Sequence, residues 1–309
     1  MEQKALLIRP GALGDTLMLL PALKDMGKRV QVMVAGREPG LSFLRKAGFQ
    51  CANMECGGWH TLFQERPDSR QRLPVPSQER VVAYLTDSDG RIVRNLRASF
   101  PGAGVHVFPA YPAPEDKVHV ARYVCATLAQ TGLPVDPDGA MERVRNRALL
   151  KEASEAVPGD LIVVHPGSGS PRKNFPPEFW LAFLERIAKE PALRSSKKGI
   201  VLLGPAEEDL QGFFGKRVSR ALEMVFCPRD EELVSLLVRA ALYAGHDSGV
   251  THLAAMLGTP TVAVFRQDNL FMWHPLGPCT RAVQSPKPDR ICFERMIEAA
   301  RMLIKSTYP

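Results

Sequence analysis

Short apolar runs alternate with amphipathic stretches along most of the chain. Helical periodicity, with apolar side chains every three or four residues, is present in residues 42–49, 89–100, 120–133 and 176–190. The apolar runs have the length of buried strands, and they cover residues 5–9, 30–35, 80–86, 104–108, 160–165, 199–203, 223–227, 241–245 and 260–265. Strands that alternate with helices predict an α/β fold of parallel sheets with helices on both faces.

The alternation restarts after the polar segment 136–160, which predicts a domain boundary near residue 155. A length of 309 residues fits two domains of about 150 residues each. We therefore expect two doubly wound domains, residues 1–155 and 156–309, with a cleft between them and ligands beyond the carboxyl ends of the strands. The last helical segment, about residues 288–305, is expected to pack back on the first domain.

The composition is that of an ordinary soluble globular protein, with 45% apolar and 24% charged residues. No run reaches the roughly 18 apolar residues that span a bilayer, and Arg9 and Asp15 interrupt the N-terminal stretch that resembles a signal peptide. The 6 cysteines lack the C-x-x-C spacing of zinc sites and redox pairs, so we expect reduced, mostly buried thiols. These features predict a cytoplasmic protein.

The net charge of +7 is shared unequally between the two halves of the chain. Residues 1–150 carry 20 Lys and Arg against 15 Asp and Glu, and residues 151–309 carry 20 against 18. The more basic first half suits an anionic partner or a membrane surface. The sequence lacks runs of Lys and Arg with interleaved aromatic residues, which argues against nucleic acid as a partner.

The first candidate site is the segment PGALGD, residues 10–15, between an apolar run and a predicted buried helix. Gly11 and Gly14 allow a tight turn and a close approach of the backbone to a ligand. Their spacing, G-x-x-G-D, differs from the G-x-G-x-x-G of a dinucleotide site. Asp15 is either an N-cap, which stabilises a helix by about 1 kcal/mol, or a general base that faces the cleft, and the two roles are compatible.

The second candidate site is the loop that follows the strand ending at His165. Residues 166–171 are all small or proline, and such a loop leaves backbone N–H groups free to face an anion. Arg172 and Lys173 come next, and two cations can neutralise phosphate charge. The pattern favours a phosphate site over a solvated loop with incidental charges.

The third candidate is the pair Glu207 and Glu208, which follows the apolar run 199–203. A carboxylate in this position accepts hydrogen bonds from ribose hydroxyls in nucleotide-binding folds. Acidic residues equally favour the first turn of a helix, so the pattern is compatible with both interpretations.

The fourth candidate is Asp247-Ser248-Gly249, which lies between an apolar run and a helix that carries His252. Ser248 is placed to N-cap this helix, whose first N–H groups form a site for a diphosphate. His252 lies in the first turn, where it can donate a hydrogen bond to a phosphate or a sugar. A lone histidine is more often structural, but its place beside Asp247 and a glycine turn favours a role in binding.

In this order, the segments are similar to those of glycosyltransferase family 9, the bacterial heptosyltransferases that build the inner core of lipopolysaccharide. The resemblance covers essentially the whole chain, from IRPGALGDTLMLLPAL through HPGSGSPRKNFPPEFW to DSGVTHLAAMLGTPTVAVF. It implies the GT-B fold, in which two Rossmann-like domains face each other across a nucleotide-sugar cleft. One departure is Arg266-Gln267-Asp268, where the family often has a Gly-Pro-Thr loop.

The resemblance also implies roles for individual residues. Asp15 matches the aspartate taken as the base that deprotonates the acceptor hydroxyl, and Gly11 and Gly14 are expected to clear space for the acceptor beside it. One glutamate is expected to meet the ribose, and we favour Glu207. The residues expected to bind the donor are Ser168, Ser170, Arg172, Lys173, Glu207, Asp247, Ser248, Gly249 and His252.

The implied reaction is an inverting transfer of a sugar, with ADP-heptose as the favoured donor, to a lipid-linked anionic acceptor of the lipopolysaccharide core. No cofactor or obligatory metal is expected, because fixed cations and a helix N-terminus can stabilise the departing diphosphate. Such an acceptor implies peripheral contact with the inner face of the cytoplasmic membrane. The alternatives are another nucleotide sugar or acceptor, or a non-catalytic nucleotide-sugar-binding protein. A nicotinamide-dependent oxidoreductase would require a G-x-G-x-x-G motif, which these segments lack.

Overall fold

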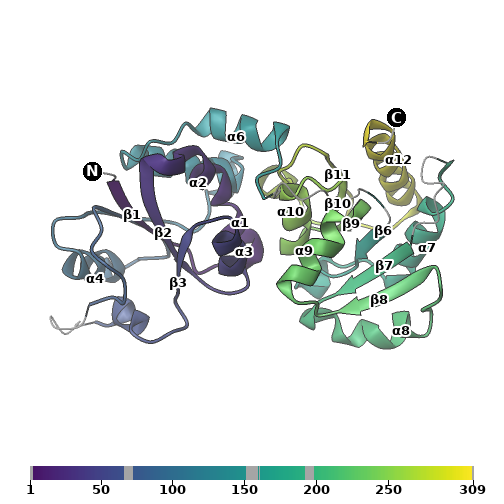
Figure 1. Ribbon diagram of the computed structural model, residues 1–309, viewed down its shortest axis with the longest axis horizontal. Helices are drawn as coiled ribbons and strands as arrows, with labels where there is room; N and C mark the ends of the chain where they lie inside the picture. The colour runs from purple at the N-terminus through teal and green to yellow at the C-terminus, as the bar shows by residue number, and fades with distance from the viewer. Residues whose placement is uncertain (1–2, 66–71, 151–158, 160, 192–197, 308–309) are drawn as a thin grey trace. The chain divides into compact units, whose positions relative to one another are not determined.

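Two compact units make up the structure, a computed structural model that describes residues 3–65, 72–150, 159, 161–191 and 198–307 (Figure 1). The first unit spans Met1–Arg143 and the second spans Val144–Pro309. The division falls inside helix α6 (Pro137–Asn146), so part of the predicted linker is helical. The predicted boundary between residues 155 and 156 lies outside the described residues.

The first unit contains a five-stranded parallel sheet in the order β3-β2-β1-β4-β5. Four of its strands coincide with predicted apolar runs, whereas β3 is a short, partly exposed edge strand without such a run. Because β1 lies at the centre, the residues that follow it reach the carboxyl edge of the sheet. The strands are β1 (Gln3–Ile8), β2 (Val30–Gly36), β3 (Gln50–Asn53), β4 (Arg80–Tyr84) and β5 (Gly104–Phe108).

The core of the first unit fixes β1 in place. Leu6 and Ile8 of β1 pack with Val81 and Ala83 of β4 and with the buried ring of Trp59. In addition to α6, the helices are α1 (Leu13–Leu17), α2 (Leu20–Met26), α3 (Gly40–Lys46), α4 (Arg91–Ser99) and α5 (Val120–Gln130), with 3-10 turns η1 (Gly27–Arg29), η2 (Trp59–Phe63) and η3 (Pro114–Asp116).

The second unit contains a six-stranded parallel sheet in the order β11-β10-β9-β6-β7-β8. Numbered within the unit, this is the order 3-2-1-4-5-6 of Rossmann folds. The sequence did not reveal β11, an edge strand whose residues are mostly half-buried or exposed. The strands are β6 (Leu161–His165), β7 (Lys198–Leu203), β8 (Leu222–Phe226), β9 (Ala240–His246), β10 (Thr261–Phe265) and β11 (Thr280–Gln284).

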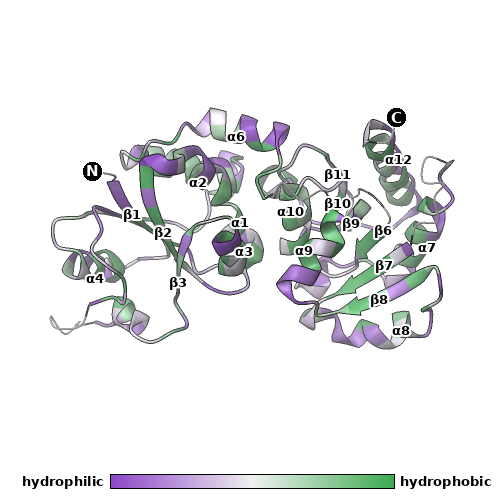
Figure 2. Ribbon diagram, in the orientation of Figure 1, coloured by the Kyte–Doolittle hydropathy of each residue, from purple (hydrophilic) through white to green (hydrophobic). Residues whose placement is uncertain are grey.

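Helices cover both faces of the second sheet, since every residue of the central strand β6 is buried. Figure 2 shows the corresponding hydropathy, with β6 and β7 largely green and α6 largely purple and white. The helices are α7 (Pro177–Ile187), α8 (Gln211–Gly215), α9 (Asp230–Val238), α10 (Gly249–Met256), α11 (Leu270–Trp273) and α12 (Arg290–Thr307), with 3-10 turns η4 (Pro171–Lys173) and η6 (Pro205–Leu210).

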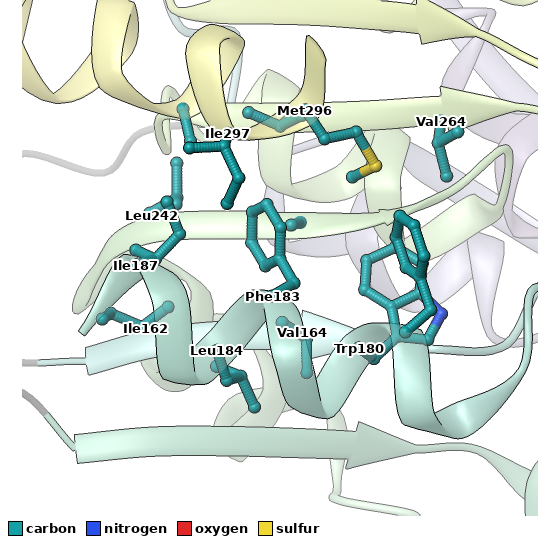
Figure 3. Close-up of a cluster of buried hydrophobic side chains, with 14 of the residues drawn as sticks. Ile162, Val164, Trp180, Phe183, Leu184, Ile187, Leu242, Val264, Met296 and Ile297 are labelled. Carbon is teal, nitrogen blue, oxygen red and sulfur yellow. The ribbon is translucent and has the colours of Figure 1, made fainter. Parts of the chain in front are cut away.

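The C-terminal helix α12 belongs to the core of the second unit. Its buried face includes Met296, Ile297 and Ala300, which lie in one cluster with Trp180 and Phe183 of α7 (Figure 3). The helix also contacts β9, β10 and β11. The apolar face of α12 therefore completes the hydrophobic core of its own unit, and the expectation that this segment packs back on the first domain stays a prediction.

A conservative truncation in this core tests how tightly it is packed. Ile187 of α7 is fully buried, whereas Ile291 of α12 is 71% exposed. We expect Ile187→Val to lower the free energy of unfolding by about 0.5–1.5 kcal/mol, because one buried methyl group is lost. Ile291→Val is the matched control and should change it by less than about 0.5 kcal/mol. Urea denaturation of both variants provides the measurement, and equal values would contradict the packing described here.

All six cysteines carry free thiols. Cys125 and Cys292 are buried, but Cys51 and Cys279 are half-buried, and the remaining two are exposed. The expectation that most of them are buried is therefore wrong. Burial raises the pKa of Cys125 to about 12, so this thiol is protonated and unreactive at neutral pH.

Candidate functional site

Asp15 lies in α1, directly beyond the carboxyl end of β1. Its Oδ2 accepts a hydrogen bond of 2.9 Å from the backbone N–H of Ala12, at the start of the same helix. The carboxylate therefore satisfies one of the N–H groups that a helix start leaves unpaired. Asp15 is therefore not the N-cap that the sequence predicted: Ala12 is the N-cap, and Asp15, the third residue of α1, reaches back to it. The Asp15 side chain is 13% exposed, so this capping contact leaves part of it open to solvent.

Gly11 is needed because the Asp15 side chain folds back over it. A methyl group at this position would lie 2.3 Å from the Cβ of Asp15 and 2.7 Å from its Oδ2, far inside van der Waals contact. Gly11 thus makes room for the carboxylate itself. The further expectation that Gly11 and Gly14 clear space for an acceptor stays a prediction.

Two residues that the sequence did not single out complete the surroundings of Asp15. Arg9 is 2% exposed, donates from Nε to the Asp15 carbonyl at 2.9 Å, and places Nη2 3.7 Å from Asp15 Oδ1. Tyr111 donates its hydroxyl to the same Oδ1 at 2.9 Å. Burial and the Asp15 carboxylate raise the pKa of Tyr111 to about 12, so its hydroxyl remains a hydrogen-bond donor at neutral pH.

The buried guanidinium of Arg9 is held on several sides. It donates from Nη1 to the carbonyl of Ala110 at 2.9 Å and lies 5.2 Å from the ring centre of Tyr84. Burial lowers the pKa of Arg9 and the Asp15 carboxylate opposes this shift; an arginine in a protein keeps its charge. The buried guanidinium thus places a fixed positive charge beside the Asp15 side chain.

In the second unit, the predicted phosphate loop runs from the end of β6 to the start of α7. Ser168 Oγ lies 2.6 Å from Asn174 Oδ1 and 3.0 Å from the carbonyl of Ser170, so the loop is closed by its own side chains. Gly169 has a φ of 70°, a backbone conformation that favours glycine. Arg172 is exposed at the end of this loop.

Lys173 and Asp247 meet at the carboxyl edge of the second sheet. Lys173 Nζ lies 2.7 Å from Asp247 Oδ2, and the side-chain amide of Asn269 donates to the same oxygen at 3.0 Å. His252 places Nε2 3.8 Å from Asp247 Oδ1, and its side chain is 3% exposed. In this structure His252 therefore acts on Asp247 and does not present its ring to solvent. The sequence predicted three members of this cluster and missed Asn269.

The charge of Asp247 is held by these partners. Burial alone would raise the pKa of Asp247, but its contacts with His252 and Lys173 outweigh burial and lower the pKa to about 2. The carboxylate is therefore ionised at any pH at which the protein is expected to work.

This depressed pKa predicts a pH dependence of stability. The folded-state pKa of about 2 lies below the ordinary aspartate value of 3.8, so ionised Asp247 contributes about 2 kcal/mol of stability above pH 4, and this contribution disappears as the pH falls towards 2. We expect the difference in unfolding free energy between wild type and Asp247→Asn to shrink by this amount over that range. Urea denaturation of both proteins, from pH 6 down to the lowest pH at which they still fold, would measure this difference. A difference that does not change with pH would contradict the ion pair.

Ser248 caps α10 as predicted. Its Oγ accepts from the backbone N–H of Thr251 at 3.3 Å, and Gly249 is the first residue of the helix. The Thr251 hydroxyl in turn forms a hydrogen bond of 3.0 Å with the hydroxyl of buried Tyr243. The N-terminus of α10 is thus fixed next to Asp247, with its first N–H groups at the carboxyl edge of the sheet.

Glu207 is buried, with 3% of its surface exposed, whereas Glu208 beside it is exposed. Glu207 Oε2 accepts from the backbone N–H of Gly204 at 2.9 Å and lies 3.5 Å from Nε2 of His165. This geometry matches the helix-turn interpretation of the two glutamates, because Glu207 reaches back to the residue that starts η6.

Arg266-Gln267-Asp268, the segment that departs from the family pattern, follows β10 at the carboxyl edge of the second sheet. Arg266 donates from Nη1 to the carbonyl of Asn174 at 3.1 Å and from Nε to the carbonyl of Pro286 at 3.2 Å. Asp268 accepts from Gln284 at 2.9 Å. These residues therefore tie the end of the phosphate loop to the region after β11.

The structure thus places the predicted residues in two groups. The donor-side residues from Ser168 to His252 lie at the ends of β6, β7 and β9 in the second unit, and Asp15 with its two glycines lies in the first. Among the residues that the structure describes, no three His, Cys, Asp or Glu side chains are grouped so that they could hold a metal ion.

The solved structures that share this architecture include glycosyltransferases of the GT-B fold. A family 9 glycosyl transferase from Veillonella parvula has a TM-score of 0.73 at 14% identity, with 99% of this chain and 98% of the other covered. The ADP-heptose LPS heptosyltransferase II of E. coli has a TM-score of 0.68 at 14% identity, with 99% and 100% covered. The E. coli heptosyltransferase WaaC, solved with ADP, has a TM-score of 0.68 at 15% identity, with 97% and 100% covered.

The sequence profile of glycosyltransferase family 9 (heptosyltransferase) matches residues 97–301. The chain therefore belongs to glycosyltransferase family 9. A comparison of the sequence with curated proteins gives no match. The predicted GT-B fold class and the predicted family are both confirmed.

Proposed function

We propose that this protein is an inverting glycosyltransferase that moves a heptose from ADP-heptose to a lipopolysaccharide core acceptor. The observation that carries the proposal is the Lys173–Asp247 ion pair, 2.7 Å long, next to the capped N-terminus of α10. A cation and a row of helix N–H groups at one strand edge suit a diphosphate. The choice of ADP-heptose is supported by structural relatives whose names specify ADP-heptose or ADP.

In the proposed reaction the acceptor oxygen attacks the anomeric carbon of the sugar as the bond to the nucleoside diphosphate breaks. Asp15 takes the proton of the acceptor hydroxyl, and Arg9 and Tyr111 hold its side chain in place. Negative charge then grows on the departing diphosphate, where Lys173, Arg172 and the N–H groups of α10 stabilise it. Since these groups can supply the positive charge, we propose that the reaction has no obligatory metal or cofactor.

The acceptor that we propose is a lipid-linked anionic saccharide, which the basic first half of the chain suits. Among the described residues, no helix combines the length and apolar character required to cross a bilayer. We propose peripheral contact with the inner face of the cytoplasmic membrane, which would bring the protein to such an acceptor.

The test is a product assay with purified protein and a panel of nucleotide sugars, each offered with a lipopolysaccharide core acceptor. The proposal expects ADP-heptose to be consumed and the acceptor to gain one heptose. Consumption of a different donor would support glycosyl transfer as the reaction but would overturn ADP-heptose as the donor. Thermal unfolding with ADP and with NAD is a companion measurement, because a ligand that binds only the folded state raises its melting temperature. Stabilisation by NAD alone would contradict the proposed class of enzyme.

A further inference from the structure

Three buried side chains connect the ends of three strands beneath the phosphate loop. His165 at the end of β6 places Nε2 3.5 Å from Glu207 Oε2, beyond β7, and Nδ1 3.4 Å from Ser248 Oγ, beyond β9. These residues are 5%, 3% and 9% exposed. The imidazole thus links the carboxylate under the loop to the serine that caps α10.

The phosphate loop lies directly on the Glu207 carboxylate. A methyl group at Gly167 would lie 1.9 Å from Glu207 Oε1, so only glycine allows this approach of the backbone. Burial alone would raise the pKa of Glu207, but its contact with His165 and the hydrogen bonds from the N–H groups of Gly204 and Gly169 outweigh burial and lower the pKa. With its oxygens covered in this way, Glu207 has almost no surface left to offer to a ribose.

We propose that Glu207 and His165 are positioning residues that hold the phosphate loop and the N-terminus of α10 at a fixed separation for the donor diphosphate. This inference rests on the proposed function, and it replaces the expected role of Glu207 as a ribose ligand. Loop N–H groups and helix N–H groups bind one diphosphate well only when their spacing is fixed before binding. A buried side-chain network between three strand ends provides that rigidity.

The first test needs no ligand. Glu207→Gln keeps the size of the side chain, but a neutral amide has one acceptor oxygen where the carboxylate has two. We expect amide hydrogen exchange in the segment 167–170 to become several-fold faster than in wild type. Asp209→Asn, on the exposed side of η6, is the matched control and should leave the exchange unchanged. Unchanged exchange in Glu207→Gln would overturn the proposal.

The second test separates a positioning residue from a ribose ligand. Calorimetry would compare ADP, 2′,3′-dideoxy-ADP and adenosine for wild type and Glu207→Gln. A positioning role predicts that the variant binds ADP and its dideoxy analogue about five- to tenfold more weakly, by the same factor for both, and that adenosine binding is unaffected. A ribose contact predicts a loss for ADP that disappears with the dideoxy analogue, and this result would overturn the proposal.

His165 provides an independent check. His165→Ala should reproduce the effects of Glu207→Gln on exchange and on ADP affinity, and His165→Gln, which retains a polar group in reach of Glu207, should restore part of both. In the double variant the losses should be less than additive, because both residues act in one network. Additive losses would overturn the link between them. If wild-type protein bound no ADP, the proposed donor would fail, and the exchange experiment would still decide the positioning role.

Discussion

Asp15→Asn is expected to lower kcat for sugar transfer by about 100- to 10,000-fold, the usual contribution of a positioned general base. The amide keeps the size of the side chain and one acceptor oxygen, but it cannot take the proton of the acceptor hydroxyl. Nucleotide affinity should stay at the wild-type value, since the residues proposed to bind the donor lie in the other unit. Single-turnover rates and calorimetry with ADP would measure the two effects separately.

The control for this variant is Tyr111→Phe, which removes the hydroxyl that donates to Asp15 Oδ1 at 2.9 Å and retains the carboxylate. The kcat of Tyr111→Phe should fall by less than about tenfold, which is the usual effect of losing a single hydrogen bond. Transfer by Asp15→Asn at the wild-type rate would show that Asp15 is not the base. Asp15→Asn leaves the buried Arg9 without its counterion. The melting temperature of Asp15→Asn therefore has to be compared with that of wild type to exclude loss of the fold.

The sequence predicted those parts of the fold that bury apolar runs. Nine strands coincide with such runs. The central strands, such as the fully buried β6, have them because central parallel strands are covered on both faces, and the edge strands β5 and β8 have them as well. The other two edge strands, β3 (QCAN) and β11 (TRAVQ), contain too many polar residues to form a continuous apolar run. The C-terminal helix shows a different limit, since its periodicity predicts an apolar face but does not say which sheet covers that face.

The candidate site divides in the same way. Asp247 and His252 could be found because they lie directly after a strand and in the first turn of the helix that follows it, and Lys173 because it ends a loop of small residues and prolines after a strand. Tyr111 could not, because its partner Asp15 is 96 residues away in sequence and only the fold brings the two together. Likewise, the contact of His165 with Ser248 spans 83 residues, and no local pattern distinguishes His165 from any other polar residue at a strand end.

Lys173→Ala is expected to weaken ADP binding by about 10- to 100-fold, the loss of one charge-assisted hydrogen bond to a phosphate. Asp247, whose side chain is 9% exposed, holds the ammonium group of Lys173 in a fixed position, and the Lys173 side chain is 28% exposed, so part of it is open to solvent. Adenosine, which has no phosphate, should bind the variant as it binds wild type. Calorimetry with both ligands would show whether the loss depends on the phosphates.

The matched control is Lys216→Ala, which removes one positive charge from an exposed position beyond α8 and should leave ADP affinity unchanged. Loss of Lys173 also removes a partner of Asp247, so the pKa of that carboxyl should rise from its value of about 2, and the variant should be less stable than wild type above pH 4. A loss of stability without a loss of ADP affinity would show that Lys173 serves only Asp247. Unchanged ADP affinity would therefore remove Lys173 from the phosphate site, and a loss restricted to phosphate-bearing ligands would establish it there.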